Sequence, residues 1–202
     1  IIDVLGHRIV EGSVGIKDGI ILGIGDYEGE KEIDVKGAYI APGFVDCHIH
    51  IESTMVTPSE FSRLVAPWGV TTVIADPHEI ANVAGENGLK FMLEDSKNSP
   101  IDIEFMLPSC VPATPFDDSG AVIDGDLTKE LLSKYDFKGL GEMMNSVGVV
   151  NCDEDIMKKL DCDCIKDGHA PMLEGKELNA YVCGGISNDH ECSNEKEALE
   201  KV

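Results

Sequence analysis

The sequence predicts an α/β fold, a partial (β/α)8 TIM-type barrel of about six of the eight units, preceded by a small β module. Two observations indicate the barrel. After Ala41, short apolar runs typical of buried parallel strands alternate with helix-like stretches. Polar residues follow nearly every one of these strands, as expected where barrel strands converge on one site. Because a closed barrel needs eight units, we expect the 202-residue chain to hold a truncated one.

The barrel segment, residues 42–202, divides into alternating elements. Strands are predicted at residues 44–48, 71–75, 101–107, 139–142, 164–167 and 185–188. Helices are predicted at residues 58–66, 87–95, 127–134, 154–160, 177–181 and 195–201. Thr57 and Pro58 mark the start of the first helix, as a cap and a first-turn proline. The apolar pair Phe44 and Val45 predicts a buried first strand.

Residues 1–41 have a different rhythm, with short β-rich runs separated by turn signals. The predicted strands are at residues 1–5, 13–17, 20–24 and 32–35. Asp18-Gly19 lies between the second and third runs and favours a tight hairpin, since both turn positions need a positive φ. We therefore expect a small β domain that ends near Ala41.

Composition excludes several classes of partner. The chain has 16 basic and 38 acidic residues, a formal net charge of -22, which repels nucleic acids and anionic membranes. We find no apolar run long enough to span a bilayer and no secretory leader, so a cytoplasmic protein is expected. Seven cysteines without a paired framework indicate reduced thiols, and Cys152, Cys162 and Cys164 are expected to be buried and free.

The end of the first barrel strand carries a His-x-His pair. His48 and His50 are two residues apart in a strand and so project from the same face, where two imidazoles can bind one divalent ion. Chance pairing on a half-exposed strand is the alternative. Asp46 and Glu52 extend the same face into a polar stripe, which a packing surface would not carry, and this favours a metal site.

Other candidate ligands follow later strands. Glu142 ends the fourth strand, and His169 and His190 lie just past the fifth and sixth. Barrel loops meet at one mouth, so these side chains are expected to converge with His48 and His50. A second cluster contains Glu52, Asp76, His78 and Glu79. It is either a turn and helix cap with a first-turn acid, or an additional metal site or outer shell of the first.

Several motifs resemble a known family. P-G-F-V-D-C-H-I-H, at residues 42–50, resembles the first barrel strand of the amidohydrolase superfamily of metal-dependent hydrolases. Four further motifs resemble the adenine deaminases within it: D-P-H-E-I-A-N-V at 76–83, G-E-M-M at 141–144, D-G-H-A-P at 167–171 and N-D-H-E at 188–191. The motifs occur in the family's order over nearly the whole chain.

The resemblance implies a β-sandwich begun by the N-terminal module and two divalent metals, manganese, iron or zinc, in the barrel. His48 and His50 would hold one metal, His169 and His190 the second, and Glu142 would bridge them. The implied reaction is hydrolysis of adenine to hypoxanthine and ammonia. The family's general acid/base is an Asp on the eighth strand, which this chain does not reach, and Glu191 is a candidate proton shuttle or purine contact. We expect an inactive fragment of a homo-oligomeric enzyme.

Two other functions compete with this interpretation. A dihydroorotase-like or N-acetylglucosamine-6-phosphate deacetylase-like hydrolase would place a basic residue at the mouth for an anionic substrate. The loops instead contain D-P-H-E, N-D-H-E and G-E-M-M, which favours a neutral substrate such as a purine. A non-catalytic metal-binding scaffold would show lost ligands, and all five candidates are present.

Overall fold

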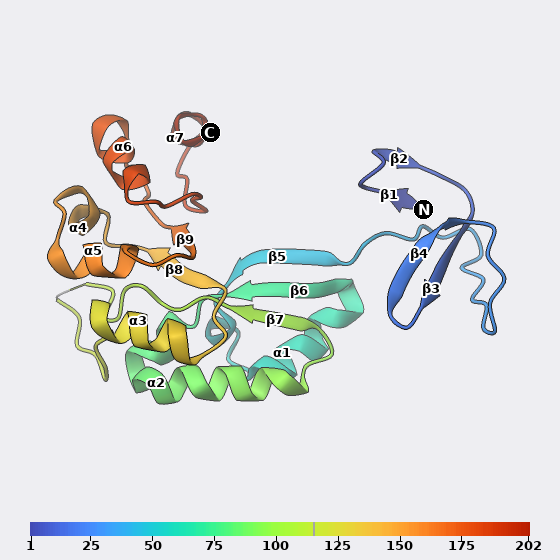
Figure 1. The fold of residues 1–202 in the computed structure, drawn as a ribbon, viewed down its shortest axis with the longest axis horizontal. Helices are drawn as coiled ribbons and strands as arrows, with labels where there is room; N and C mark the ends of the chain where they lie inside the picture. Colours follow the sequence, from blue (N-terminus) through green and yellow to red (C-terminus); the bar gives the residue numbers. More distant parts are fainter. Residues whose placement is uncertain (115) are drawn as a thin grey trace. The chain divides into compact units, whose positions relative to one another are not determined.

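The computed structural model describes residues 1–114 and 116–202, which divide into two compact units, Ile1–Phe44 and Val45–Val202 (Figure 1). The division falls close to Ala41, where the sequence pattern changes. The second unit alternates strands and helices, and its β6–β7 and β8–β9 pairs are parallel. It is therefore an α/β unit, as the sequence predicts.

The first unit consists of two antiparallel pairs. Its strands are β1 (Ile2–Asp3), β2 (Arg8–Ile9), β3 (Ser13–Lys17) and β4 (Ile20–Gly25). Asp18 and Gly19 join β3 to β4 with φ values of 51° and 77°, so the expected hairpin turn is present. The strand expected at 32–35 is wrong. The chain turns there instead, because the Asp34 carboxylate accepts a hydrogen bond from the amide of Lys36 and Lys36 has a positive φ.

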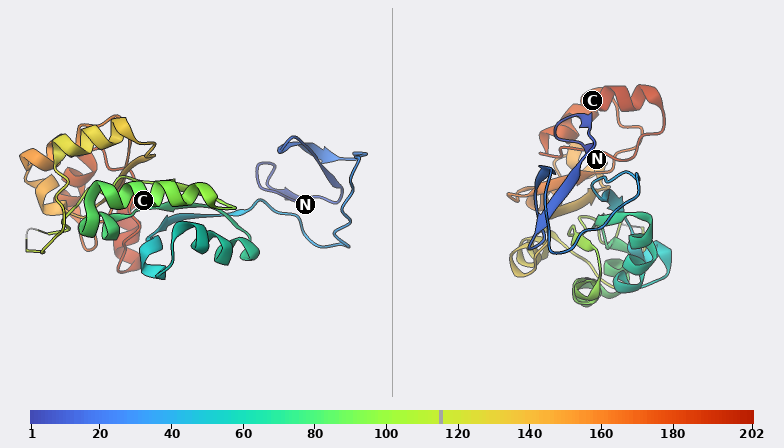
Figure 2. Two further views of the ribbon diagram at one scale, coloured as in Figure 1. Left: turned by 90° about the horizontal axis from the view of Figure 1, so that it is seen from below. Right: turned by 90° about the vertical axis from the view of Figure 1, so that its right-hand side faces the viewer.

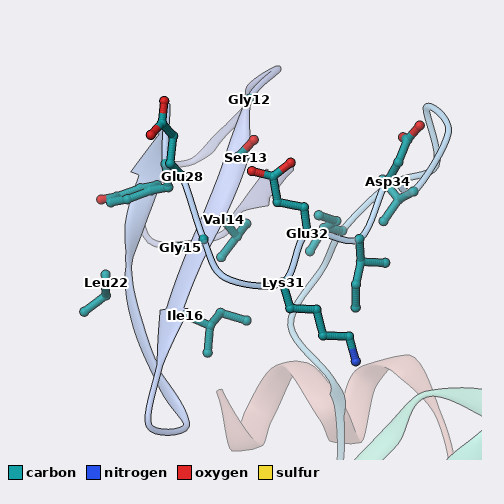
Figure 3. Close-up of a pocket in the computed structure, with 15 residues that line it drawn as sticks. Gly12, Ser13, Val14, Gly15, Ile16, Leu22, Glu28, Lys31, Glu32 and Asp34 are labelled. Carbon is teal, nitrogen blue, oxygen red and sulfur yellow. The ribbon is translucent and has the colours of Figure 1, made fainter.

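An open cavity of about 470 Å³ lies in this unit, at the place where a small domain would have its packed core. Val14 and Ile16 of β3 line it together with Lys31 and Glu32 of the following loop (Figure 3). Among the described residues of the unit, Gly15 alone is fully buried. The hairpin thus has too little buried apolar surface to form a core of its own.

The second unit is built on a sheet with the order β5-β6-β7, continued by the pair β8-β9. The strands are β5 (Phe44–Ile49), β6 (Val70–Ala75), β7 (Asp102–Phe105), β8 (Gly139–Met143) and β9 (Ile165–Gly168). A parallel bridge between Leu107 and Leu140 connects the two groups just past the end of β7. The strand ends that carry the candidate ligands therefore follow one another along a single edge.

Helices cover the sheet. The helical segments are η1 (Ile51–Thr54), α1 (Pro58–Val65), η2 (Ala66–Trp68), α2 (His78–Asp95), η3 (Ser96–Asn98), α3 (Gly125–Lys134), α4 (Ser146–Val150), α5 (Glu154–Leu160), α6 (Gly175–Cys183) and α7 (Glu195–Lys201). Helices α1 and α2 lie on the same side of β5, β6 and β7 (Figures 1 and 2). Helix α2 consists of two helical stretches joined at Gly85, whose φ of 55° and ψ of -138° are not helical. The predicted helix at 87–95 falls in the second stretch, and the first stretch, which begins at His78, was not predicted. The five residues of α4 were missed, since so short a helix has little periodicity.

The core of the second unit lies between these helices and the strands. Phe61 of α1 and Met92 of α2 pack with Val73 and Phe105 of the sheet. Two further buried groups, around Leu131 and around Tyr181, continue the core toward the other helices. The buried side chains hold the strands in register and thereby fix their C-terminal ends.

Two expectations about the strands are wrong. Phe44 and Val45 are 66% and 56% exposed, because β5 is the first strand in its sheet and β6 covers one side of it. Residues 185–188 form no strand among the residues described. They run beside β9, where Ser187 donates a backbone hydrogen bond to Lys166 and the Asn188 side chain accepts one from Gly168.

None of the helices in the described ranges is long and apolar enough to cross a membrane. All seven cysteines are free thiols, but their burial differs from expectation. Cys152 is exposed, and Cys162 and Cys164 are half-buried with their Sγ atoms 2.8 Å apart. Burial and the neighbouring Cys164 raise the pKa of Cys162 to about 12, which keeps this thiol protonated.

Replacement of the buried Leu89 of α2 by alanine tests the core. We expect Leu89→Ala to lower the free energy of unfolding by about 2–5 kcal/mol, because it leaves a cavity between α2 and its neighbours. Leu64→Ala on the exposed face of α1 is the control, with an expected change within about 0.5 kcal/mol. Denaturant unfolding measures both, and equal losses in the two variants would contradict the described packing.

Candidate metal centre

Glu142 occupies the centre of the site. It lies near the C-terminal end of β8, and its side chain is 2% exposed. Its backbone amide donates a hydrogen bond of 2.9 Å to Oδ2 of Asp76, which follows β6. The residue before it must be small, because a Cβ atom on Gly141 would collide with the Asp76 carboxylate. The glycine therefore allows two acidic residues from different strands to approach each other.

Five of the six histidines surround the Glu142 carboxylate. His48 and His50 come from the end of β5, His78 follows β6, His169 follows β9 and His190 lies in the segment beside β9. Each places a ring nitrogen within 4 Å of a Glu142 oxygen. The distances to Oε2 are 2.8 Å from His169 Nδ1, 3.0 Å from His190 Nε2 and 3.6 Å from His48 Nε2; those to Oε1 are 2.9 Å from His78 Nδ1 and 3.5 Å from His50 Nε2. A buried carboxylate with so many imidazoles around it is a strong candidate for a ligand shared between cations.

The ligand atoms fall into two overlapping groups. His48, Glu142 and His190 form one triad, and His50, His78 and Glu142 form the other. His48 and His190 are also stacked, with ring centroids 3.7 Å apart. His169 adjoins the first triad, since its Nδ1 lies 3.3 Å from His190 Nε2. Glu142 is common to both triads, one oxygen facing each.

Partners outside the triads orient two of the rings. His48 Nδ1 lies 3.2 Å from Oδ2 of Asp167, and His50 Nδ1 lies 2.8 Å from the backbone oxygen of Asp76. Since a carbonyl oxygen can only accept, His50 carries its proton on Nδ1 and presents a lone pair at Nε2. The carboxylate of Asp167 favours the same arrangement in His48. Carboxylate and carbonyl partners of this kind are typical of metal-bound histidines.

The geometry fits a cation between the rings. With both Nδ1 atoms donating outward, the Nε2 lone pairs of His48 and His50 face each other at 3.1 Å. Two lone pairs at that distance repel unless a proton or a metal ion lies near them. The buried Nδ1 of His78 also has no aligned hydrogen-bond partner among the described residues, although Glu142 Oε1 is 2.9 Å away. The donor set thus suits a divalent metal held by imidazole and carboxylate.

The carboxylate and the histidines of the site shift one another's pKa values. Burial would raise the pKa of Glu142, but the hydrogen bond with His169 and the close approach of His78 outweigh it and hold that pKa far below its usual range. Contact with Glu142 raises the pKa of His169. The pKa of His48 is also raised, since Asp167 and Glu142 overcome the opposing effect of burial.

Two groups at the edge of the cluster shift differently. Burial lowers the pKa of His190, and the neighbouring His48 lowers it further. Burial raises the pKa of Asp76 to about 7, an effect that His78 opposes and Glu142 reinforces. The charge of Glu142 thus favours protonation of His48 and His169, whereas burial opposes a charge on His190 and on Asp76.

The second predicted cluster contains His78 together with Glu52, Asp76 and Glu79. Glu52 Oε1 accepts a hydrogen bond from the amide of Ile80, and Glu79 Oε1 accepts one from Ser53. The remaining oxygens, Oε2 of Glu52 and Oε2 of Glu79, are buried and have no hydrogen-bond partner in the described part of the chain. Burial raises the pKa of Glu52, and the nearby Glu79 adds to this effect. A cavity of about 230 Å³ borders this cluster, lined by His78, Glu79, Asn82, Cys110, Ala113 and Asp117.

The structure brings together all five predicted ligands and adds His78 to them. From the sequence, His78 belonged to a second cluster that was either a helix cap or a further metal site. The resemblance implied that His48 and His50 hold one metal and His169 and His190 the other. By distance, His48 instead shares a triad with His190, and His50 shares one with His78. Asp167 and Tyr181 were missed. The Tyr181 hydroxyl accepts a hydrogen bond from the amide of His169 and donates one to Met143. Asp167 was accessible from sequence, because it is two residues before His169 in D-G-H-A-P.

Parallel strands whose ends present histidines around a buried carboxylate define this unit as an α/β protein with a candidate metal-binding site. The comparison with known sequences identifies the family: residues 39–202 match the amidohydrolase family, and the chain belongs to it.

Similar proteins include adenine deaminases. The chain is 50% identical to that of Clostridium acetobutylicum over 206 residues and 48% identical to that of Petrotoga mobilis over 204 residues. It is 46% identical to that of Archaeoglobus fulgidus over 202 residues. In each case the match covers 100% of this chain and 36% of the relative, so the chain spans about a third of the length of these curated relatives.

Replacement of Glu142 tests the centre. We expect Glu142→Gln to weaken divalent metal binding by more than about 100-fold, beyond the 10–100-fold typical of losing an outer partner, because both triads lose a shared anionic ligand. Equilibrium dialysis with elemental analysis measures the affinity. Glu130→Gln, an exposed carboxylate on α3, is the control. Unchanged metal binding in Glu142→Gln would exclude Glu142 as a ligand.

Proposed function

We propose that this chain is part of an adenine deaminase, which converts adenine and water to hypoxanthine and ammonia. The observation that carries the proposal is the complete ring of five histidines around Glu142, found in a chain about half identical to adenine deaminases along its whole length. A non-catalytic scaffold would not need all six groups to converge. The family and the site thus support the same activity.

The proposed centre holds two divalent cations, manganese, iron or zinc. His48 and His190 with Glu142 would hold one, and His50 and His78 with Glu142 the other, with His169 beside the first. The imidazole and carboxylate ligands suit all three metals. When bound, a pair of such cations lowers the pKa of water and stabilises negative charge near it.

The chain's own residues would prepare the site. Asp167 and the Asp76 carbonyl keep the imidazoles of His48 and His50 turned inward, so little reorganisation is needed during reaction. Deamination also needs a proton for the departing ammonia. We assign Glu191 to this proton transfer or to purine contact, because its exposed carboxylate adjoins His190 and acts electrostatically on His169. The principal general acid/base expected for the family is an Asp on the eighth strand, which is not among the six proposed units.

A neutral substrate fits the surroundings of the site. The described residues that line the cavity beside His78 include two carboxylates, Glu79 and Asp117, and no lysine or arginine. An anionic substrate would meet repulsion there, whereas adenine is uncharged at neutral pH. The cavity therefore favours a purine over the carboxylate or phosphate substrates of related hydrolases.

The second cluster is proposed to serve the centre as well. The buried, unpartnered oxygens of Glu52 and Glu79 could take an additional cation or orient the His78 side of the site. Elemental analysis separates the roles. A third ion that disappears in Glu79→Gln assigns a metal site, and an unchanged count of two assigns the cluster to positioning.

We also propose that β5 to β9, with residues 185–188 beside β9, are six units of a (β/α)8 barrel. The parallel pairing of β6 with β7 and of β8 with β9 supports this arrangement. The open cavity of the first unit supports a β-sandwich half that another segment of the whole protein completes. The greater length of the relatives is consistent with such a segment.

The activity is tested by measuring ammonia release from adenine by the whole protein loaded with manganese or zinc. We expect turnover of adenine and none of dihydroorotate or N-acetylglucosamine 6-phosphate. Turnover of either of these two, without deamination of adenine, would contradict the proposed substrate.

Replacement of Asp167 by asparagine tests the orientation of His48. We expect Asp167→Asn to reduce metal affinity or deamination by about 10–100-fold, since the ring loses its charged partner while the shape is kept. Asp163→Asn, two residues before β9 begins and exposed, is the matched control. If the two variants behave alike, Asp167 has no role in the centre.

A further inference from the structure

The C-terminal helix α7 carries a buried lysine with an unusual set of partners. The Lys201 side chain is only 8% exposed. Its Nζ donates to the backbone oxygens of Ala170 at 2.8 Å and Glu191 at 3.1 Å. It also forms ion pairs of 2.8 Å with Asp189 and with Glu197. One ammonium group thus connects the helix to two separate loops.

The two acidic partners extend these contacts. Glu197 is 1% exposed, and its oxygens accept hydrogen bonds from the amides of Met172 at 2.7 Å and Ser193 at 2.8 Å. Asp189 accepts from the amides of Ala170 at 3.2 Å and Glu191 at 2.8 Å. The side chains of Asp189, Lys201 and Glu197 form one network. The backbone groups that hydrogen-bond to it all lie in the same two loops.

These loops carry two histidines of the metal centre. Residues 169–174 and 186–194 lie in neither helix nor strand. His169 is directly followed by Ala170, whose amide and carbonyl both bind the network, and His190 lies between Asp189 and Glu191. The network therefore fixes the backbone on at least one side of each histidine. The second triad, with His50 and His78, has no residue in these loops.

Burying three charged groups is costly, and the same loops could be packed with apolar side chains at lower cost. Charged groups in fixed directions, however, specify one geometry of the backbone. A carboxylate that accepts two amides, paired with an ammonium that donates to two carbonyls, tolerates little displacement of either loop.

We propose that Lys201 and Glu197 are positioning residues, which hold His169 and His190 against Glu142 and so set the affinity of the metal site formed with His48. This inference rests on the proposed metal centre. It assigns to α7 a role in one of the two cation sites and none in the other.

The test compares variants of the whole protein by equilibrium dialysis with zinc. We expect Lys201→Met and Glu197→Gln each to weaken one of two bound ions by about 10–100-fold, the range found for outer partners of ligands, and to leave the other unchanged. Lys196→Met is the control, because Lys196 is exposed on the same helix and pairs with Glu174 outside the network. NMR of the imidazoles should show changes at His169 and His190 and not at His50 or His78.

The outcomes distinguish the two proposals. Equal loss of both ions, or wild-type affinity for both in folded Glu197→Gln, would overturn the positioning role. Glu197→Gln preserves side-chain shape and carries this test even if Lys201→Met does not fold. Absence of zinc binding in the wild-type protein, with His48→Ala identical to it, would refute the metal centre itself.

Discussion

The burial of a single carboxylate constrains the rest of this structure. Glu142 is withdrawn from water at the end of a strand, and an isolated carboxylate in that position would be strongly destabilising. Five imidazoles, one buried carboxyl with a raised pKa and the backbone of neighbouring strands are arranged so that the charge is compensated. Because the compensating groups follow several strands, His48 and His50 at the end of β5, Asp76 and His78 after β6 and His169 after β9, the ends of these strands must lie close together.

The fold meets this requirement through packing far from the site. Helices α1 and α2 cover β6 and β7, and their apolar contacts fix where those strands end. Small residues complete the arrangement, since Gly141 allows Asp76 to reach the amide of Glu142. The precision of the centre thus depends on ordinary core residues as well as on the ligands.

The sequence predicted much of this because local patterns carried the information. The parallel strands, most helices and the convergence of His48, His50, Glu142, His169 and His190 follow from apolar periodicity and from the position of polar residues at strand ends. Failures occurred where tertiary context or the chemistry of a single turn decides. The exposure of Phe44 depends on which strand lies next to it, and the turn at 34–37 depends on a local side-chain hydrogen bond. Tyr181 and Lys201 act on residues brought close only by folding, which no local pattern shows.

The candidate ligands of the proposed centre are spread from residue 48 to residue 190, almost the whole length of the second unit. An ion bound there would contact the native chain and very little of the unfolded chain, so occupancy and folding would be linked thermodynamically. At a free metal concentration of 100 times the dissociation constant, each such ion would add about 2.7 kcal/mol to the free energy of unfolding. The supply of metal in the cell would then govern how long the folded protein survives, in addition to whether it can react.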